Sequence, residues 1–482
     1  MKTCVNRALA ALNRLDERLS RRSRFLGMVF ALLFAGALAV LSINIGPLKN
    51  LNDIGGWSNR FVFIVLTAGA HAAVLAACTA AHKGRFSRLL LRETILTLGL
   101  VILLQGINQK THFYTQEIQP LVRAMDAGGL RAAAGYDTHL SAPMILILYL
   151  LTRGPVYDMY TVKLATIFCW LLLAVLLLAF AQKKRLGWRE DVLLTLCMIL
   201  PQAFMNAGCT AQTDVFCLLP LAASLWLAMD SKGCAIPQMC SAVLYGLAAA
   251  MSGLAWYALP VYGYLAWKGR LEAKHLAVSA AVLLALCLPM AAAGMTIQEA
   301  AGSLFRANLS LPLYASGAPS AMSWLPRVAV EEMEEYFMLS RVPNIDPVTN
   351  AQPYYTQAHF EQVALGVTIA LQAAFGALAV WIVRRNMDGA SRAFALVLLA
   401  LMCCPASTSG AWLAADILCL YWIVAKPRLR LPAGFVLFAT AGTSAYPMLG
   451  ETQLPMVYGF VLCLLALCML LDIVPMGRAR EG

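Results

Sequence analysis

Residues 164–180 read LATIFCWLLLAVLLLAF, a stretch without a single charged side chain. Such a stretch is long enough to cross the hydrocarbon layer of a membrane as an α-helix, and runs of roughly 16 to 25 apolar residues recur along the chain. The 482 residues are 60% hydrophobic and 13% charged, with a mean hydropathy of +0.70. Soluble domains contain only about 45–50% apolar residues, so a soluble enzyme is excluded, as are disorder, collagen and a coiled coil. The predicted fold class is all-α, a polytopic integral membrane protein.

Fourteen segments are predicted as membrane-spanning helices, of which 258–267 is short. They lie near residues 25–45, 61–81, 94–108, 158–182, 191–208, 213–231, 237–257, 258–267, 275–294, 362–383, 393–408, 410–425, 433–447 and 456–473. Residues 142–152 are apolar but too short to cross, so they predict a re-entrant or half-buried helix. The segment 25–45 is too long for a signal-peptide core and is predicted to be retained.

Lysine and arginine number 37 and aspartate and glutamate 25, which gives a net charge of +12. On a soluble protein this excess would suggest a nucleic-acid partner. Here the basic residues gather in the tail of residues 1–24 and at alternate ends of the spans, in clusters at 83–92, 183–189, 268–274, 384–392 and 426–430. The protein is predicted to lie in the cell membrane, and the positive-inside rule places both of its termini in the cytoplasm. These positive charges are explained by membrane orientation, so no nucleic-acid partner is expected.

The spans divide the chain into six predicted regions. They are a basic tail (1–24), N-terminal spans (25–107), a core (108–294) that opens with a first outer loop (108–141), a second extracytoplasmic loop (295–361), C-terminal spans (362–473) and a cytoplasmic tail (474–482). Outer loops of this length are usually functional. The charged side chains expected inside spans are few, Asp416 and Asp472, and Asp416 is expected to bond a neighbouring helix.

The sequence contains no CxxC, HExxH, GxxxxGK[ST] or GxGxxG motif, so zinc hydrolysis, ATP hydrolysis and dinucleotide binding have no support. Ionisable residues at the edge of a span cost free energy unless they meet water, a partner or a substrate, which makes them candidates for function. Such residues gather in two outer segments, Asn108–Ser141 and Pro201–Asp214.

In the second of these segments Asn206, Gln212 and Asp214 lie in a tight turn between two spans. Amide and carboxylate groups in this turn could bond sugar hydroxyls or hold a divalent cation beside a lipid phosphate. The alternative is a turn capped by its own polar side chains, with Asp214 as the N-cap of the next helix.

Between about residues 105 and 425 the chain carries a series of short features whose order along the sequence is informative. They are Phe113 and Tyr114, Pro120, Gly128-Gly129, Ser141-Ala142-Pro143, Pro201, Asn206, Gln212, Asp214, Pro260, the stretch from Gln298 through Asn308 to Trp324, and Pro405 with Asp416. This order resembles the GT-C superfamily of membrane glycosyltransferases, in particular bacterial relatives of the mannosyltransferase that adds the second mannose of the GPI anchor. The resemblance implies a multi-span, GT-C-like bundle that takes a hexose such as mannose from a polyprenyl-phosphate sugar donor at the outer membrane face. Its partners would be this donor, a glycan or glycolipid acceptor, and membrane lipid.

The chain departs from the family pattern at several positions. Thr210-Ala211 replaces a Trp-Gly pair, Ser252 occupies the position of a lysine, and residues 407–411 replace a His-Glu-Arg-Tyr stretch. The reaction needs a carboxylate base and cationic groups for the leaving phosphate. The resemblance therefore points to Glu117 as base, with Asp126 and Asp137 behind it.

The remaining candidates would bind substrate in the same outer region. Lys110, Arg123 and Arg131 could hold phosphate, and the other predicted contacts are His112, Tyr114, Asn206, Gln212 and Asp214. Three functions stay open at this point: a glycosyltransferase, a non-catalytic GT-C-fold partner in envelope polysaccharide assembly, and a transporter or lipid flippase.

Overall fold

The computed structural model describes residues 13, 15–20, 22–44, 57–111, 114–136, 138, 140–231, 234–269, 271–272, 274–309, 319–321, 357–403, 409–444 and 454–473. Every regular element in these ranges is a helix, which confirms the all-α prediction. Among the described residues, four helices are long and apolar enough to cross a membrane, and a bent helix pair would make a fifth span. These helices support the prediction of a helical membrane protein. Most of the predicted second outer loop, 295–361, lies outside the described residues.

A helix occupies each of the fourteen predicted spans in the described part of the chain. These helices are α2 (Ser23–Asn44), α3 (Trp57–Ala81), α4 (Phe86–Leu104), α7 (Asp158–Lys183), α8 (Arg189–Ile199) continued by α9 (Pro201–Ala203) and η3 (Phe204–Cys209), α10 (Asp214–Asp230), α11 (Ala235–Met251), α12 (Leu259–Trp267), α13 (Lys274–Ala292), α16 (Gln357–Arg384), α17 (Gly389–Cys403), α18 (Ser409–Ala425), α19 (Arg430–Ser444) and α21 (Leu454–Leu470). The other elements are η2 (Tyr114–Ile118), α5 (Gln119–Ala134), α6 (Ala142–Leu151), η4 (Gly253–Ala258), α14 (Ile297–Leu309) and η6 (Pro427–Leu429).

The chain folds into two compact units. Unit 1 consists of Met1–Ala255, Leu265–Leu304 and Leu420–Pro427, and unit 2 of Trp256–Tyr264, Phe305–Cys419 and Arg428–Gly482. Helices α2 to α11 and α13 belong to unit 1, whereas α16, α17, α19 and α21 belong to unit 2. Unit 1 therefore contains the first outer segment and the turn that the sequence singled out.

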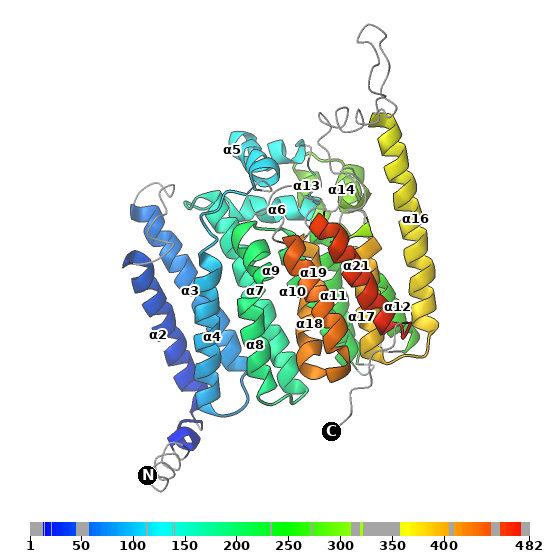
Figure 1. The fold of residues 1–482 in the computed structure, drawn as a ribbon. Coiled ribbons are helices and arrows are strands. Elements are labelled where there is room, and N and C mark those ends of the chain that lie inside the picture. Colours follow the sequence, from blue (N-terminus) through cyan, green and yellow to red (C-terminus); the bar gives the residue numbers. More distant parts are fainter. Residues whose placement is uncertain are drawn as a thin grey trace, which may run out of the picture. The chain divides into compact units, whose positions relative to one another are not determined.

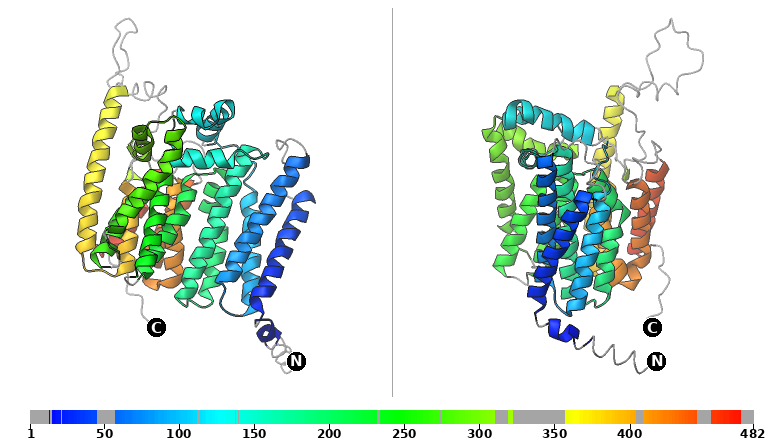
Figure 2. Two further views of the ribbon diagram at one scale, coloured as in Figure 1. Left: turned by 180° about the vertical axis from the view of Figure 1, so that it is seen from behind. Right: turned by 90° about the vertical axis from the view of Figure 1, so that its left-hand side faces the viewer.

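Helices α2, α3, α4, α7, α8 and α10 of unit 1 run alternately in opposite directions, and α5 and α6 lie across one end of them (Figures 1 and 2). The basic turns lie at the other end. There Lys183 at the end of α7 forms an ion pair with Asp230 at the end of α10. Three clusters predicted for one side of the membrane, 83–92, 183–189 and 268–274, thus lie at one end of unit 1.

The predicted span 191–208 is a bent helix pair. Helix α8 ends at Ile199, and the chain bends by 43° before α9 and the π-helix η3. Leu200 has an extended backbone (φ −63°, ψ 116°) and Pro201 begins α9. A residue that precedes proline disfavours the helical region, and proline suits the first position of a helix, so Pro201 fixes the place of the bend.

Glycines bring α4 close to the bent pair. A Cβ added to Gly208 would lie 2.7 Å from the carbonyl oxygen of Leu103, and one added to Gly106 would lie 2.6 Å from Sγ of Cys209. Larger residues would push the backbones apart. The end of α4 and the π-helix η3 therefore pack backbone against backbone, next to the turn that carries Asn206.

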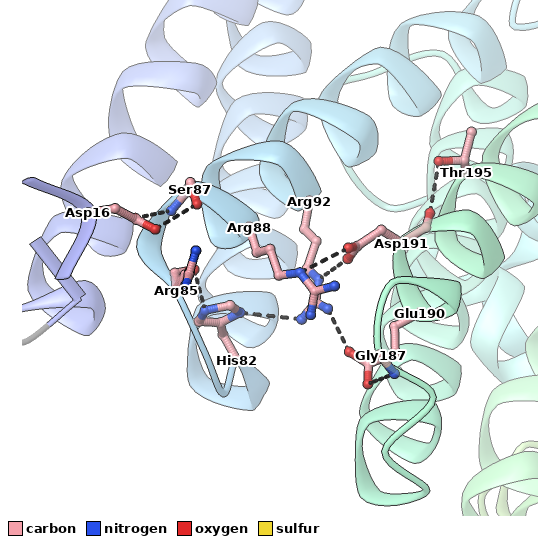
Figure 3. Close-up of polar contacts among 10 residues, drawn as sticks. All are labelled: Asp16, His82, Arg85, Ser87, Arg88, Arg92, Gly187, Glu190, Asp191 and Thr195. Carbon is pink, nitrogen blue, oxygen red and sulfur yellow. Dashed lines mark hydrogen bonds and ion pairs between the residues drawn. The ribbon is translucent and has the colours of Figure 1, made fainter. Parts of the chain in front are cut away.

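A buried charge cluster joins α4 to α8 at the basic end of unit 1 (Figure 3). Arg92 has no exposed surface; its Nη2 lies 2.7 Å from Oε2 of Glu190 and its Nε lies 2.6 Å from Oδ1 of Asp191. Arg88 contributes a longer contact of 3.4 Å to the other oxygen of Asp191. Glu190 and Asp191 also lie in the first turn of α8, where the positive end of the helix dipole favours their negative charges.

His82, in the turn between α3 and α4, completes this cluster (Figure 3). Its Nδ1 lies 3.3 Å from Nη1 of Arg92 and its Nε2 lies 3.1 Å from the carbonyl oxygen of Arg85. Burial, and then the neighbouring guanidinium, lower the pKa of His82. A neutral ring that donates from Nε2 and accepts at Nδ1 satisfies both contacts.

Side chains that precede α2 in the sequence cap the N-terminus of α4 (Figure 3). The carboxylate of Asp16 accepts from the backbone N–H of Ser87 (2.9 Å) and from its hydroxyl (3.0 Å). The hydroxyl of Ser20 accepts from the backbone N–H of Phe86 (2.9 Å). Arg85, at the N-cap position, offers no side-chain acceptor, so residues that precede α2 satisfy the first N–H groups of α4.

The part of α18 that belongs to unit 2, Ser409–Cys419, carries a buried carboxylate. Asp416 of α18 has no exposed surface, and its Oδ1 accepts a hydrogen bond from the hydroxyl of Thr440 in α19 (2.6 Å). Asp416 thus bonds a neighbouring helix, as the sequence analysis expected.

Candidate functional site

The segment 201–214 is helical as far as Cys209, through α9 and η3, so the prediction that Asn206 lies in a tight turn is wrong. The polar groups of this segment, called the turn below, bond largely to one another. Asn206 is 1% exposed, and its Nδ2 donates to the carbonyl oxygen of Gln202 (2.8 Å). The carbonyl oxygen of Asn206 accepts from the backbone N–H of Gln212 (3.0 Å) and from the hydroxyl of Thr210 (3.2 Å). Asn206 and Gln212, which the sequence predicted as binding residues, are therefore neighbours in one turn.

The side chain of Gln212 is 7% exposed, and its Oε1 has no hydrogen-bond partner among the described residues. A buried amide oxygen without a partner costs about 1–3 kcal/mol. Among the polar groups of the turn, this oxygen has unused capacity to accept a hydrogen bond from a hydroxyl group of a bound molecule.

Asp214 is the first residue of α10 and is half-buried. The alternative in which Asp214 is the N-cap is wrong, because the N-cap position belongs to Thr213, which makes no side-chain cap. The carboxylate of Asp214 instead accepts a hydrogen bond of 2.6 Å from the hydroxyl of Ser252, the residue that follows α11. This bond joins the start of α10 to the end of α11.

The start of α6 lies beside the same end of α11. Ser141 caps α6 by accepting from the backbone N–H of Met144 (3.3 Å), and its hydroxyl donates to the carbonyl oxygen of Ala250 (2.6 Å). The backbone N–H of Ala142 donates to the hydroxyl of Ser303 in α14 (2.8 Å). The Ser141 bond joins the start of α6 to the final turn of α11, immediately before Ser252, and the Ala142 bond joins it to α14.

Lys163 was not predicted from the sequence, although it lies inside the span 158–182. The residue has no exposed surface, and its Nζ donates to the carbonyl oxygens of Gly106 (3.2 Å), Ile107 (3.1 Å) and Gln109. A buried lysine inside a span was the signal that could have identified it. Lys163 thus holds the residues that directly follow α4 and anchors the beginning of the first outer segment.

A neighbouring hydroxyl joins the same helix to the turn. Thr166, one turn further along α7, donates to the carbonyl oxygen of Ala207 in η3 (2.8 Å). Helix α7 thus holds both the start of the first outer segment, through Lys163, and the turn that contains Asn206. The two outer segments singled out in the sequence share one supporting helix.

The predicted catalytic carboxylate, Glu117, lies half-exposed on the π-helix η2. The same short helix buries Tyr114, whose pKa is raised well above its ordinary value by burial first and by the nearby Tyr157 second. Tyr114 is therefore a neutral hydroxyl. Lys110 and Arg123 have exposed side chains in the same segment. His112 and Asp137 lie outside the described residues.

Helix α5, which carries Arg123, contains a break in its backbone. Gly129 has φ +67°, a conformation that residues with a Cβ rarely adopt, and Gly128 is also non-helical. Asp126, just before the break, forms an ion pair of 2.8 Å with Arg153. The carboxylate of Asp126 is thus already paired, whereas Glu117 forms no ion pair with another described residue.

The described ranges contain no group of three or more His, Cys, Asp or Glu side chains that could hold a metal ion. Unit 1 contains one bonded carboxylate (Asp214), one buried amide oxygen (Gln212) and one half-exposed carboxylate (Glu117). Such groups can bond hydroxyls and accept a proton. Comparisons of the chain with protein-family models, with characterised proteins and with solved structures find no match.

Proposed function

We propose that this chain is an integral membrane glycosyltransferase of the GT-C type, located in the cell membrane with both termini in the cytoplasm. It moves a hexose, in the first instance mannose, from a polyprenyl-phosphate donor to an extracytoplasmic glycan or glycolipid. One observation carries the proposal: the family-like positions Asp214 and Ser252, which are 38 residues apart in the sequence, are joined by a hydrogen bond of 2.6 Å.

The proposed roles follow from the exposure and contacts of each residue. Glu117 is half-exposed and forms no ion pair with a described residue, which suits a base that takes a proton from the acceptor hydroxyl. Lys110 and Arg123 are exposed cations in the same segment and suit the donor phosphate. Gln212 and Asp214 accept hydrogen bonds from sugar hydroxyls. In this proposal the Asp214 carboxylate would be the ligand for a divalent cation.

A second candidate function is a non-catalytic protein that keeps a GT-C-type fold and acts as a partner in envelope polysaccharide assembly. The observation that favours it is the self-contained bonding of the turn. The Asn206 amide donates to Gln202, and the Asp214 carboxylate accepts from Ser252. A third function, as a transporter or flippase, gains no support from Lys163 and Asp416, because both bond neighbouring helices.

The test uses the full chain in nanodiscs with a short-chain polyprenyl-phosphate mannose, and measures both binding and release of polyprenyl phosphate in the presence of a mannoside acceptor. We expect Glu117→Gln to bind the donor as the wild type does but to turn over at least 100-fold more slowly, as for loss of a general base. Asp214→Asn should weaken binding of the donor. Asp126→Asn is the matched control, because its carboxylate lies in the same segment but is already paired with Arg153.

Equal turnover by wild type and Glu117→Gln would refute the role of this base. Binding of the donor without any turnover by the wild type, with several acceptors, would favour the non-catalytic alternative. If neither the sugar lipid nor polyprenyl phosphate binds, the proposal of a GT-C-type enzyme fails.

A further inference from the structure

Unit 2 contains an apolar groove between α12 and α16. It encloses about 350 Å³ and is lined by Pro260, Gly263, Tyr264, Phe375, Gly376, Ala379, Val380, Val383 and Arg384. Eight of these nine residues are uncharged, and the arginine stands last in the sequence of α16. The volume is within the lower range of small-molecule sites, about 300–1,000 Å³.

Two glycines open the groove. A Cβ added to Gly263 or to Gly376 would meet no other atom within 4 Å. Each glycine therefore leaves space that no side chain of unit 2 fills. The walls beside this space include Val380, which is 52% exposed, so the groove is open along an apolar face of α16. Inside a membrane, only hydrocarbon can occupy such a surface at low cost.

The end of the groove beside the C-terminus of α16 is positively charged. Arg384 lines it directly, and the next residue, Arg385, lies with its guanidinium 4.8 Å from the centre of the Trp381 ring. Neither arginine forms an ion pair with a carboxylate among the described residues. Two adjacent cations at the end of an apolar groove complement a molecule with a hydrocarbon chain and an anionic head.

A third cation lies behind the lining residue Tyr264. Arg392 is only 8% exposed; its Nη1 donates to the Tyr264 hydroxyl (2.7 Å) and its Nη2 to the carbonyl oxygen of Arg385 (2.7 Å). Its Nε has no hydrogen-bond partner within the described ranges. The positive charge of this guanidinium adds to the positive potential at this end of the groove.

We propose that this groove binds an anionic phospholipid, with an acyl chain against Gly263 and Gly376 and the phosphate at Arg384 and Arg385. The occupant is a membrane phospholipid and not the polyprenyl-phosphate donor, because these arginines belong to the basic clusters that the sequence places on the cytoplasmic side, where anionic phospholipids concentrate. This inference does not depend on the proposed glycosyltransferase activity.

The test is native mass spectrometry of the full chain in detergent, titrated with phosphatidylglycerol or with phosphatidylcholine of identical acyl chains. We expect phosphatidylglycerol to bind at least tenfold more tightly. Gly376→Leu should fill the groove and raise the Kd for phosphatidylglycerol at least tenfold. Gly366→Leu is the matched control, since it lies on the same helix, also meets no atom within 4 Å and is not part of the groove.

A second variant tests the head group. Arg384→Gln should reduce the preference for phosphatidylglycerol over phosphatidylcholine to threefold or less, whereas Arg24→Gln, an exposed arginine at the start of α2, should leave it unchanged.

Gly376→Leu and Gly366→Leu both remove a glycine from a helix, so neither variant is expected to lower the thermal stability of the protein.

Three results would overturn the inference. Equal Kd values for the two lipids would exclude recognition of the head group. Wild-type binding by Gly376→Leu would show that the lipid binds elsewhere. Displacement of phosphatidylglycerol by short-chain polyprenyl phosphate at a tenfold lower concentration, with the same dependence on Gly376, would assign the groove to the isoprenoid lipid instead.

Discussion

The charge cluster at the basic end of unit 1 predicts a large loss of stability in Arg92→Met. Methionine has a similar length but neither charge nor donors, so the substitution leaves Glu190 and Asp191 without the guanidinium that lies 2.7 and 2.6 Å from their oxygens. Removal of one partner from a buried ion pair costs about 3–5 kcal/mol. We expect the lower end, about 3 kcal/mol, because Arg88 still lies 3.4 Å from Asp191.

The assay is equilibrium unfolding in mixed micelles with a rising fraction of denaturing detergent, followed by tryptophan fluorescence. The triple variant Arg92→Met, Glu190→Gln, Asp191→Asn should lose less stability than Arg92→Met alone, because it leaves no unpaired charge. Lys183→Met is the control: both side chains of its pair with Asp230 are nearly half exposed, so it should cost at most about 1 kcal/mol.

A loss below 1 kcal/mol in Arg92→Met would contradict the burial argument. So would a triple variant that is as unstable as the single one, since the loss would then come from packing and not from unpaired carboxylates.

Three further measurements test other contacts. Gly208→Ala should cost about 1–3 kcal/mol in the same unfolding assay, because the new Cβ would lie 2.7 Å from the carbonyl oxygen of Leu103; no loss would refute the close packing. Lys163→Met should cost about 1–3 kcal/mol through unsatisfied carbonyls at the end of α4, and should speed amide exchange in residues 105–111. The lowered pKa of His82 means that the folded state holds this proton less tightly than the unfolded state. Stability should therefore fall as the pH drops below about 6.5, and less so in His82→Gln. Identical pH profiles would exclude that role.

The helical framework was predictable from the sequence because each element depends on local chemistry. The run 158–182 predicts α7 (Asp158–Lys183) from its length and apolar character alone, and Pro201 carries the signal for the bend that divides 191–208. The division into two units was not predictable in this way, since it depends on contacts between segments that are far apart in the chain.

The candidate site was predictable only in part. Asn206 and Gln212 are close in sequence, so a turn predicts their contact. The bond between Asp214 and Ser252 depends on how α10 and α11 pack, and sequence order alone contains no such distance. Lys163 escaped prediction because a single cation inside a strongly apolar run hardly changes its average hydropathy, although its cost in a membrane is large.

The position of Lys163 has a consequence for how the protein is made. An isolated helix with a lysine inside its apolar stretch enters a membrane at a cost of up to about 2.5–3.5 kcal/mol, less near the ends of the helix. The carbonyl oxygens that accept hydrogen bonds from this ammonium belong to Gly106, Ile107 and Gln109. The ribosome synthesises these residues more than fifty residues before Lys163. Helix α4 is thus already available when α7 emerges, and we expect α7 to insert together with α4 and not as an independent helix.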